Sequence, residues 1–111
     1  MKLAYEYLGR LVRIVDGDTA IFSVDLGFDT HRVETLRLLG IDSPEPHTET
    51  REAGDAATAH LEKLLDGCEQ VLIRTQRDKS DKYGRYLATL VRSDGVNVNA
   101  QMVKDGHASC V

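Results

Sequence analysis

A single amphipathic segment of helical length stands among several segments with the two-residue alternation of β-strands, and this order most constrains the fold. The helical segment is 51–65, where apolar side chains recur at the spacing of one helix face: Ala57, Leu61, Leu64 and Leu65. Gly67 follows where a C-terminal cap belongs. The sequence therefore predicts a mainly β protein with one main helix in the middle of the chain.

Five strands are predicted, three before this helix and two after it: 5–15, 19–26, 31–39, 70–76 and 86–92. The turns between them are too short for crossovers, so antiparallel hairpins should dominate. A short second helix is predicted over 99–105, with Asn99 as its N-cap and Gly106 at its end. Five strands with one helix after the third is the arrangement of the OB-fold, a closed five-stranded Greek-key β-barrel. The 111 residues are predicted to form one such domain over 1–111.

The charge balance argues against nucleic-acid binding by bulk electrostatics. The formal net charge is −4 and the pI is near 5.5, whereas proteins that hold nucleic acid by charge alone are normally basic. A protein of this composition that handles nucleic acid needs a few well-placed cations or a metal ion. No apolar stretch approaches the roughly 18 residues of a membrane span. The amino terminus carries Glu6 and lacks an apolar signal region, which predicts a cytoplasmic protein or one whose leader has been removed.

The cysteines and histidines show no metal-ligand spacing. Cys68 and Cys110 form no CxxC pair, so zinc is not predicted. Two separate thiols are the favoured interpretation, and a single disulfide is the alternative. The histidines are interpreted as surface or cap residues: His31, His47, His60 and His107.

The motif DGDT places Asp16 and Asp18 two residues apart, although Asp-Gly is also an ordinary hairpin turn. A calcium loop of the EF-hand type does not fit. Ala20 stands at the third acidic position, Ile21 replaces the glycine, and Gly27 replaces the closing glutamate.

The motif IDSPEP places Asp42 and Glu45 three residues apart in a turn, so both can reach one point. Pro44 fixes its own φ, and Pro46 drives Glu45 away from the helical region. A glutamate held in few conformations suits a general base or the surroundings of a metal ion. Taken alone, the motif is more typical of a rigid polar turn.

Two further segments place cations beside strands. Arg37 interrupts an apolar strand, where it either reaches the surface along its aliphatic stem or offers a planar fork for a phosphate. The motif DKYGR adds Lys82, Tyr83 and Arg85 around a glycine. Alone it is a polar turn; as part of a site it offers a second fork, a lysine and an aromatic face for a base.

DGDT, LRLLGIDSPE and DKYGR occur in this order on a matching strand and helix layout. In this the chain resembles the staphylococcal nuclease family, also called thermonuclease or SNase-like. The likeness runs from about Leu11 to Ala108, and short phage or bacterial forms are nearest in size. For a phage-encoded form, the expected location is the host cytoplasm.

The resemblance implies a role for each matching residue. It implies a Ca²⁺ site built from the Asp18 and Asp42 carboxylates with the Ser43 main-chain carbonyl. Arg37 and Arg85 match the family's phosphate-binding arginines, and Glu45 matches its catalytic glutamate, which either orients or deprotonates the attacking water. Lys82 and Tyr83 match residues that flank the bound nucleotide in the family. The implied activity is endonucleolytic cleavage of DNA and RNA at the 5′ P–O bond, which leaves 3′-phosphates.

Some features depart from the family pattern. Ser43 stands where threonine is usual, the loop after Glu45 is short and acidic, and the chain ends at Val111 before the family's final helix. Two explanations of that end are open: a naturally minimal form, or a homo-oligomer in which a second subunit closes the barrel. The competing function is a non-catalytic OB-fold module that binds nucleic acid, with a metal-independent interaction domain behind it. Retention of five chemical side chains favours the nuclease: Asp18, Arg37, Asp42, Glu45 and Arg85.

Overall fold

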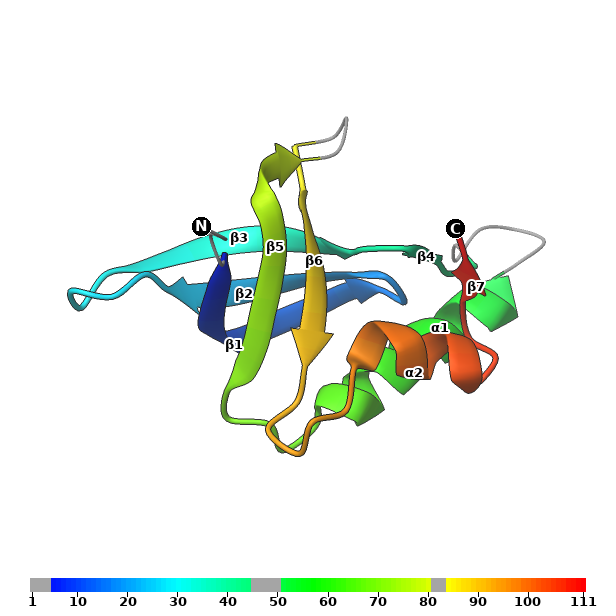
Figure 1. Ribbon diagram of the computed structural model, residues 1–111. Helices are drawn as coiled ribbons and strands as arrows, with labels where there is room; N and C mark the ends of the chain where they lie inside the picture. The colour runs from blue at the N-terminus through cyan, green and yellow to red at the C-terminus, as the bar shows by residue number, and fades with distance from the viewer. Residues whose placement is uncertain (1–4, 45–50, 81–83) are drawn as a thin grey trace.

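The computed structural model describes residues 5–44, 51–80 and 84–111 and places them in a β-barrel with two helices (Figure 1). The elements follow in chain order: β1 (Glu6–Asp16), β2 (Thr19–Asp25), β3 (His31–Leu38), β4 (Ile41–Asp42), α1 (Arg51–Leu65), β5 (Val71–Ser80), β6 (Tyr86–Val91), α2 (Val98–Lys104) and β7 (Ser109–Cys110). The closed barrel has the order β1-β2-β3-β6-β5, which confirms the predicted five-stranded barrel.

The pairing of the strands brings distant parts of the chain together. Within the barrel every pair is antiparallel except β3 with β6, which run parallel. The register sets Arg37 of β3 beside Thr19 of β2 on one side and Leu87 of β6 on the other. The start of β2, the end of β3 and the start of β6 therefore meet at one edge of the barrel.

The core fills the barrel and continues beneath the two helices. Alternate residues of the strands point inward, and those that are fully buried include Phe22, Leu36, Leu38, Ile73 and Leu90. The buried stripe of α1 closes one end of the barrel with its apolar members Ala57, Leu61 and Leu65. Helix α2 adds Val98 and Met102 to the same core. Figure 1 shows both helices on this side, with the β2–β3 hairpin extending away from them.

Two features at the carboxyl end differ from the sequence prediction. The N-cap of α2 is Asn97, whose side chain accepts a hydrogen bond from the amide of Ala100, and the predicted cap Asn99 lies inside the helix. The helix starts at Val98, one residue earlier than predicted. In addition, β4 and β7 pair as a small antiparallel sheet that the sequence did not indicate.

Two further predictions concern the state of the cysteines and the presence of a membrane-spanning helix. Cys68 and Cys110 are free thiols, in agreement with the favoured interpretation. Within the described part of the chain, neither helix combines the length and the apolar character needed to cross a bilayer.

Candidate active site

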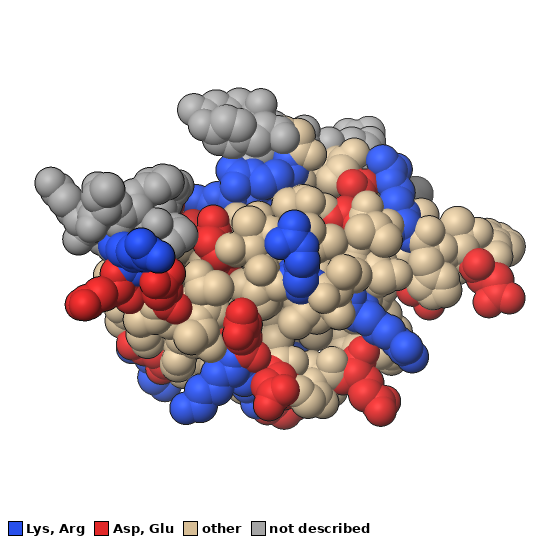
Figure 2. Space-filling model, turned by 180° about the vertical axis from the view of Figure 1, so that it is seen from behind, with Lys and Arg blue, Asp and Glu red and all other residues tan. Residues whose placement is uncertain are grey.

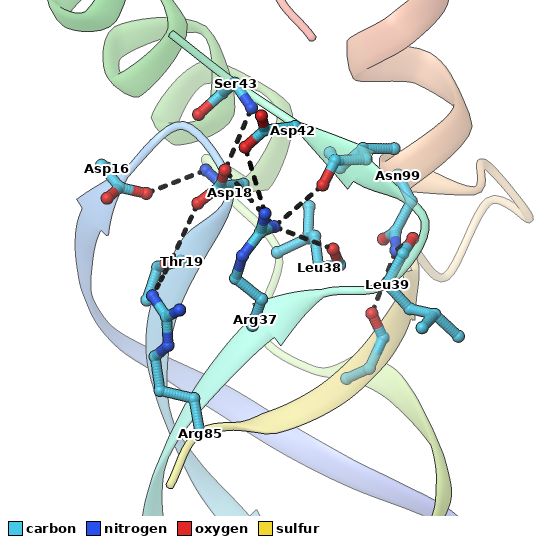
Figure 3. A network of polar contacts seen from close by, with 12 residues as sticks. Asp16, Asp18, Thr19, Arg37, Leu38, Leu39, Asp42, Ser43, Arg85 and Asn99 are labelled. Carbon is cyan, nitrogen blue, oxygen red and sulfur yellow. Dashed lines mark hydrogen bonds and ion pairs between the residues drawn. The ribbon is translucent and has the colours of Figure 1, made fainter. Parts of the chain in front are cut away.

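Three segments meet at the edge of the barrel where the polar residues of the sequence motifs gather (Figure 3). The first is the β1–β2 turn with Asp16 and Asp18, and the second is the end of β3 with the adjoining β4. The third segment is the start of β6, which Arg85 precedes. A main-chain hydrogen bond of 2.7 Å from the amide of Leu38 to the carbonyl of Asp18 joins the first two segments.

Gly17 lets the β1–β2 turn pack directly against α1 and β4. A Cβ atom at this position would lie 2.6 Å from the Cβ of Ala57 and 2.9 Å from the Cβ and Oγ of Ser43. Such separations leave no room for any side chain. The glycine in DGDT is therefore required by close packing, and this packing brings Asp18 next to Ser43.

Asp18 is the most buried charged group of the site, with 6% of its surface exposed. Its Oδ1 accepts a hydrogen bond of 2.9 Å from Thr19 Oγ1, and its Oδ2 accepts one of 3.0 Å from the amide of Ser43. Oδ2 also lies 3.3 Å from Nη1 of Arg37. Burying a carboxylate is costly unless it is paired and hydrogen-bonded, and Asp18 has both kinds of partner.

Arg37 occupies the centre of the network in Figure 3. Its Nη1 donates to the carbonyl of Ile41 at 2.9 Å and to that of Leu38 at 3.2 Å. Its Nη2 lies 3.2 Å from Oδ1 of Asp42. The guanidinium therefore joins both carboxylates of the predicted metal site, and its side chain keeps only 18% exposure. A surface hollow of about 400 Å³ adjoins it, lined also by Leu87 and Val111.

Arg85, which directly precedes β6, contributes to the same network. Its Nη1 donates to Thr19 Oγ1 at 3.4 Å, and that hydroxyl in turn donates to Asp18. Asp18 is thus contacted directly by Arg37 and through Thr19 by Arg85. Two guanidinium groups close to one carboxylate leave an excess of positive charge, which attracts an anion.

The two aspartates of the β1–β2 turn have opposite pKa shifts. Burial raises the pKa of Asp16 to about 6, and the neighbouring Asp18 adds to this rise. Burial also acts to raise the pKa of Asp18, but hydrogen bonds from Asp16 and the Ser43 amide, with the charge of Arg37, outweigh it and leave that pKa below its usual value. Asp18 is therefore ionised at a pH at which Asp16 still holds a proton.

The described oxygen groups that could hold a hard divalent cation at this edge are the carboxylates of Asp18 and Asp42. Two carboxylates converge on one guanidinium, and the amide of Ser43 binds Asp18, so the main chain of Ser43 lies against the carboxylate. Asp42 is 63% exposed at its side chain and has room for further ligands. The described residues contain no group of three or more His, Cys, Asp or Glu side chains that could hold a metal. An ion here would thus depend on main-chain oxygen and water besides the two carboxylates, which suits Ca²⁺.

The structure places five of the predicted site residues in one network: Asp18, Arg37, Asp42, Ser43 and Arg85. The other three lie outside the described residues: Glu45, Lys82 and Tyr83. Sequence reasoning missed Thr19, which is 1% exposed and links Arg85 to Asp18. Its place directly after the second aspartate of DGDT was the available signal.

Charge on the molecular surface is otherwise mixed. Figure 2 shows basic and acidic side chains interspersed over the face seen from behind, without a broad basic area. This distribution accords with the net charge of −4. A polyanion would therefore find no broad basic area on this face.

Comparison with known proteins identifies relatives of the chain. The sequence model of the family described as "Staphylococcal nuclease homologue" matches residues 35–111. The chain is 31% identical over 111 residues to Endonuclease YhcR of Bacillus subtilis (strain 168), covering 93% of this chain and 9% of that protein. It is 35% identical over 100 residues to an uncharacterized endonuclease of Escherichia coli, and the match covers 90% of this chain and 58% of that protein. It is 37% identical over 99 residues to the Thermonuclease of Staphylococcus intermedius, and the match covers 86% of this chain and 55% of that protein. The chain thus spans less than two thirds of each of these relatives.

Proposed function

Because the chain belongs to the family of staphylococcal nuclease homologues, we propose that it is an endonuclease that hydrolyses phosphodiester bonds of DNA or RNA. The observation that carries the proposal is the meeting of Arg37, Arg85 and the carboxylates of Asp18 and Asp42 in one network. Relatives named endonuclease and thermonuclease support it.

The proposed roles of the residues follow from the charge that develops during the reaction. Water attack on a phosphodiester increases the negative charge on the phosphoryl oxygens. Arg37 and Arg85 would bind these oxygens, because a guanidinium offers several donors in a fixed plane and keeps its charge at any working pH. The proposed role of Glu45 is to orient or deprotonate the attacking water.

The proposed cofactor is Ca²⁺, held by Asp18, Asp42 and the main-chain carbonyl of Ser43. When bound, the ion would supply positive charge to the phosphate as a Lewis acid. The chain's own residues then have distinct tasks. Asp18 is held in place by the Ser43 amide and by Thr19, while Asp42 presents an exposed carboxylate beside it. The proposed products carry 3′-phosphates, as expected for cleavage at the 5′ P–O bond.

The proposal is tested by incubating single-stranded DNA, labelled at its 5′ end, with the protein and either Ca²⁺ or a chelator. We expect shortened products with Ca²⁺ only, and a 3′-phosphatase should change the mobility of those products. Parallel RNA and double-stranded DNA substrates establish the preference. Binding of DNA without cleavage in the presence of Ca²⁺ would overturn the nuclease and favour a non-catalytic nucleic-acid-binding module.

A further inference from the structure

Asn99 is a buried polar residue that the proposed function has not yet used. It is 4% exposed and lies in the first turn of α2. Its Nδ2 donates to the carbonyls of Leu39 and Ala88, each at 3.0 Å, and its Oδ1 accepts from the amide of Leu90 at 3.1 Å. Both amide protons and the carbonyl oxygen of the side chain are therefore hydrogen-bonded to main chain outside its own helix.

The partners of Asn99 connect three elements. Ala88 and Leu90 belong to β6, whereas Leu39 directly follows β3. The amide of Leu39 also donates to the carbonyl of Ala88 at 2.8 Å. Figure 3 shows Asn99 reaching from α2 toward this part of the chain, beside the segment that carries Arg37. Asn99 thus fixes the peptide group that leaves β3 relative to both β6 and α2.

This peptide group lies between the two main-chain acceptors of Arg37. The guanidinium donates to the carbonyl of Leu38 on one side and to that of Ile41 on the other. Between them Gly40 has a φ of +79°, a conformation that glycine adopts without strain and that gives the turn little stiffness of its own. The direction of both carbonyls therefore depends on contacts from outside the turn, and Asn99 supplies one of them at Leu39.

We infer that Asn99 is a positioning residue for the phosphate-binding guanidinium: by holding the Leu39 carbonyl, it fixes the two carbonyls that orient Arg37. The catalytic part of this inference rests on the proposed nuclease function; the orientation of Arg37 does not. An asparagine is a poor helix former, and burying its amide is costly unless every polar atom is paired. The amide also ties α2 to β6 through Ala88 and Leu90, so the orientation of Arg37 is the property that distinguishes a positioning role from a purely structural one.

The test compares Asn99→Ser with Asn97→Ala. Asn97→Ala removes the N-cap of the same helix and leaves the Leu39 carbonyl bonded, so it reports the effect of weakening α2 alone. Asn99→Ser keeps a small polar side chain, and Asn99→Ala is a second variant in case the first retains a bridging water. All are assayed at a temperature at which circular dichroism shows that each is folded.

Two measurements are made on each variant. The first is kcat and KM for DNA cleavage, where misplacement of a charge-stabilising group by a fraction of an ångström costs on the order of tenfold or more in kcat. We expect that loss in the Asn99 variants, with a smaller change in KM, and near wild-type kcat in Asn97→Ala. The second is the NMR signal of the Arg37 Nε–H group, which should shift or broaden in the Asn99 variants only.

The outcomes separate the two proposals. If the wild type does not cleave, the proposed function fails, and the Arg37 signal still decides whether Asn99 positions the guanidinium. An unchanged Arg37 signal in both Asn99 variants would overturn the positioning role. Equal loss of kcat in Asn99→Ser and Asn97→Ala would overturn it as well, because the loss would then come from α2 as a whole.

Discussion

Under the proposed function, Arg37 combines two tasks in one guanidinium. Nη1 contacts two main-chain carbonyls and the buried Asp18, and Nη2 contacts the exposed Asp42. The contacts of Nη1 hold the guanidinium in a fixed position. The planar fork leaves directions in which a phosphate can be bound, whereas the ammonium of a lysine is a single point of charge.

We therefore expect Arg37→Lys to lower the cleavage rate on the order of a hundredfold or more, because an ammonium cannot bind carbonyls, carboxylates and phosphate at once. The same loss is expected for Arg85→Lys. Single-turnover cleavage assays measure both. Arg32→Lys is the matched control, since Arg32 lies on the same strand, pairs with Glu34 and is 63% exposed at its side chain. Near wild-type rates in both site variants would refute the two-arginine clamp.

Gly17 provides a second test at the level of one residue. In Gly17→Ala the new methyl group would collide with Ala57 and with Ser43, whose amide binds Asp18. We expect a loss of about 1–3 kcal/mol in the free energy of unfolding, as is usual for overpacking, together with weaker Ca²⁺ binding. Urea denaturation and calorimetry measure these two effects. Gly54→Ala is the control: it adds a methyl group to the buried stripe of α1, so it reports the effect of changed helix packing without a change in the β1–β2 turn. Unchanged Ca²⁺ affinity in Gly17→Ala would show that the close contact does not shape the site.

At the scale of elements, the strands and α1 could be predicted because each carries its own periodicity. The pattern over 51–65 identified α1 with the bounds that the structure has. The pair β4 and β7 could not be predicted, since two residues hold no period and their pairing depends on the rest of the fold. The N-cap of α2 was misplaced because Asn97 and Asn99 both suit a cap, and only tertiary contacts show that Asn99 bonds to β6.

Five of the predicted site residues lie in one network, but the sequence could not predict how they are connected. The motifs and the family resemblance pointed to Asp18, Arg37 and Arg85, which the structure joins. They could not show that Arg37 lies between both carboxylates, because this depends on the register of β2 with β3 and on the turn before β4. Hydrogen bonds across three elements leave no periodic trace in a sequence.

The junction of α1 and α2 should respond to acid. Nε2 of His60 lies 2.7 Å from Oδ2 of Asp105, and the His60 ring stacks on that of His107. The hydrogen bond from His60, followed by that from Gln101, holds the pKa of Asp105 below its ordinary value of 3.8. Because the folded-state pKa is lowered, this contribution is complete above that ordinary value and is lost as the pH falls through the lower one.

We therefore expect Asp105→Asn to flatten the dependence of the melting temperature on pH below about pH 4, where the wild type loses this contribution. Thermal melts from about pH 2 to about pH 6 measure it. Glu62→Gln, at an exposed position of α1, serves as the control for removal of one carboxylate. Parallel curves for wild type and Asp105→Asn would show that this contact does not couple to folding.

For the whole molecule, the net charge is −4 and the face seen in Figure 2 carries mixed charge, so under the proposed function we expect substrate binding to depend on the small region around Arg37. Asp18 and Asp42 both contact the Arg37 guanidinium there. Under the proposed function, a bound cation would add a positive charge beside the two carboxylates. A phosphate could then bridge the cation and the arginines, so that each ligand strengthens the binding of the other.

A thermal melt with Ca²⁺ alone, with a nucleoside 3′,5′-bisphosphate alone, and with both shows whether cation and phosphate bind cooperatively. At about a hundred times its dissociation constant a ligand adds about 2.7 kcal/mol, which raises the melting temperature of a domain of this size by roughly 10 °C. We predict a rise of that order with both ligands together, clearly larger than the sum of the two separate rises. A nucleotide that raises the melting temperature as much alone as with Ca²⁺ would contradict a site in which cation, phosphate and arginines meet.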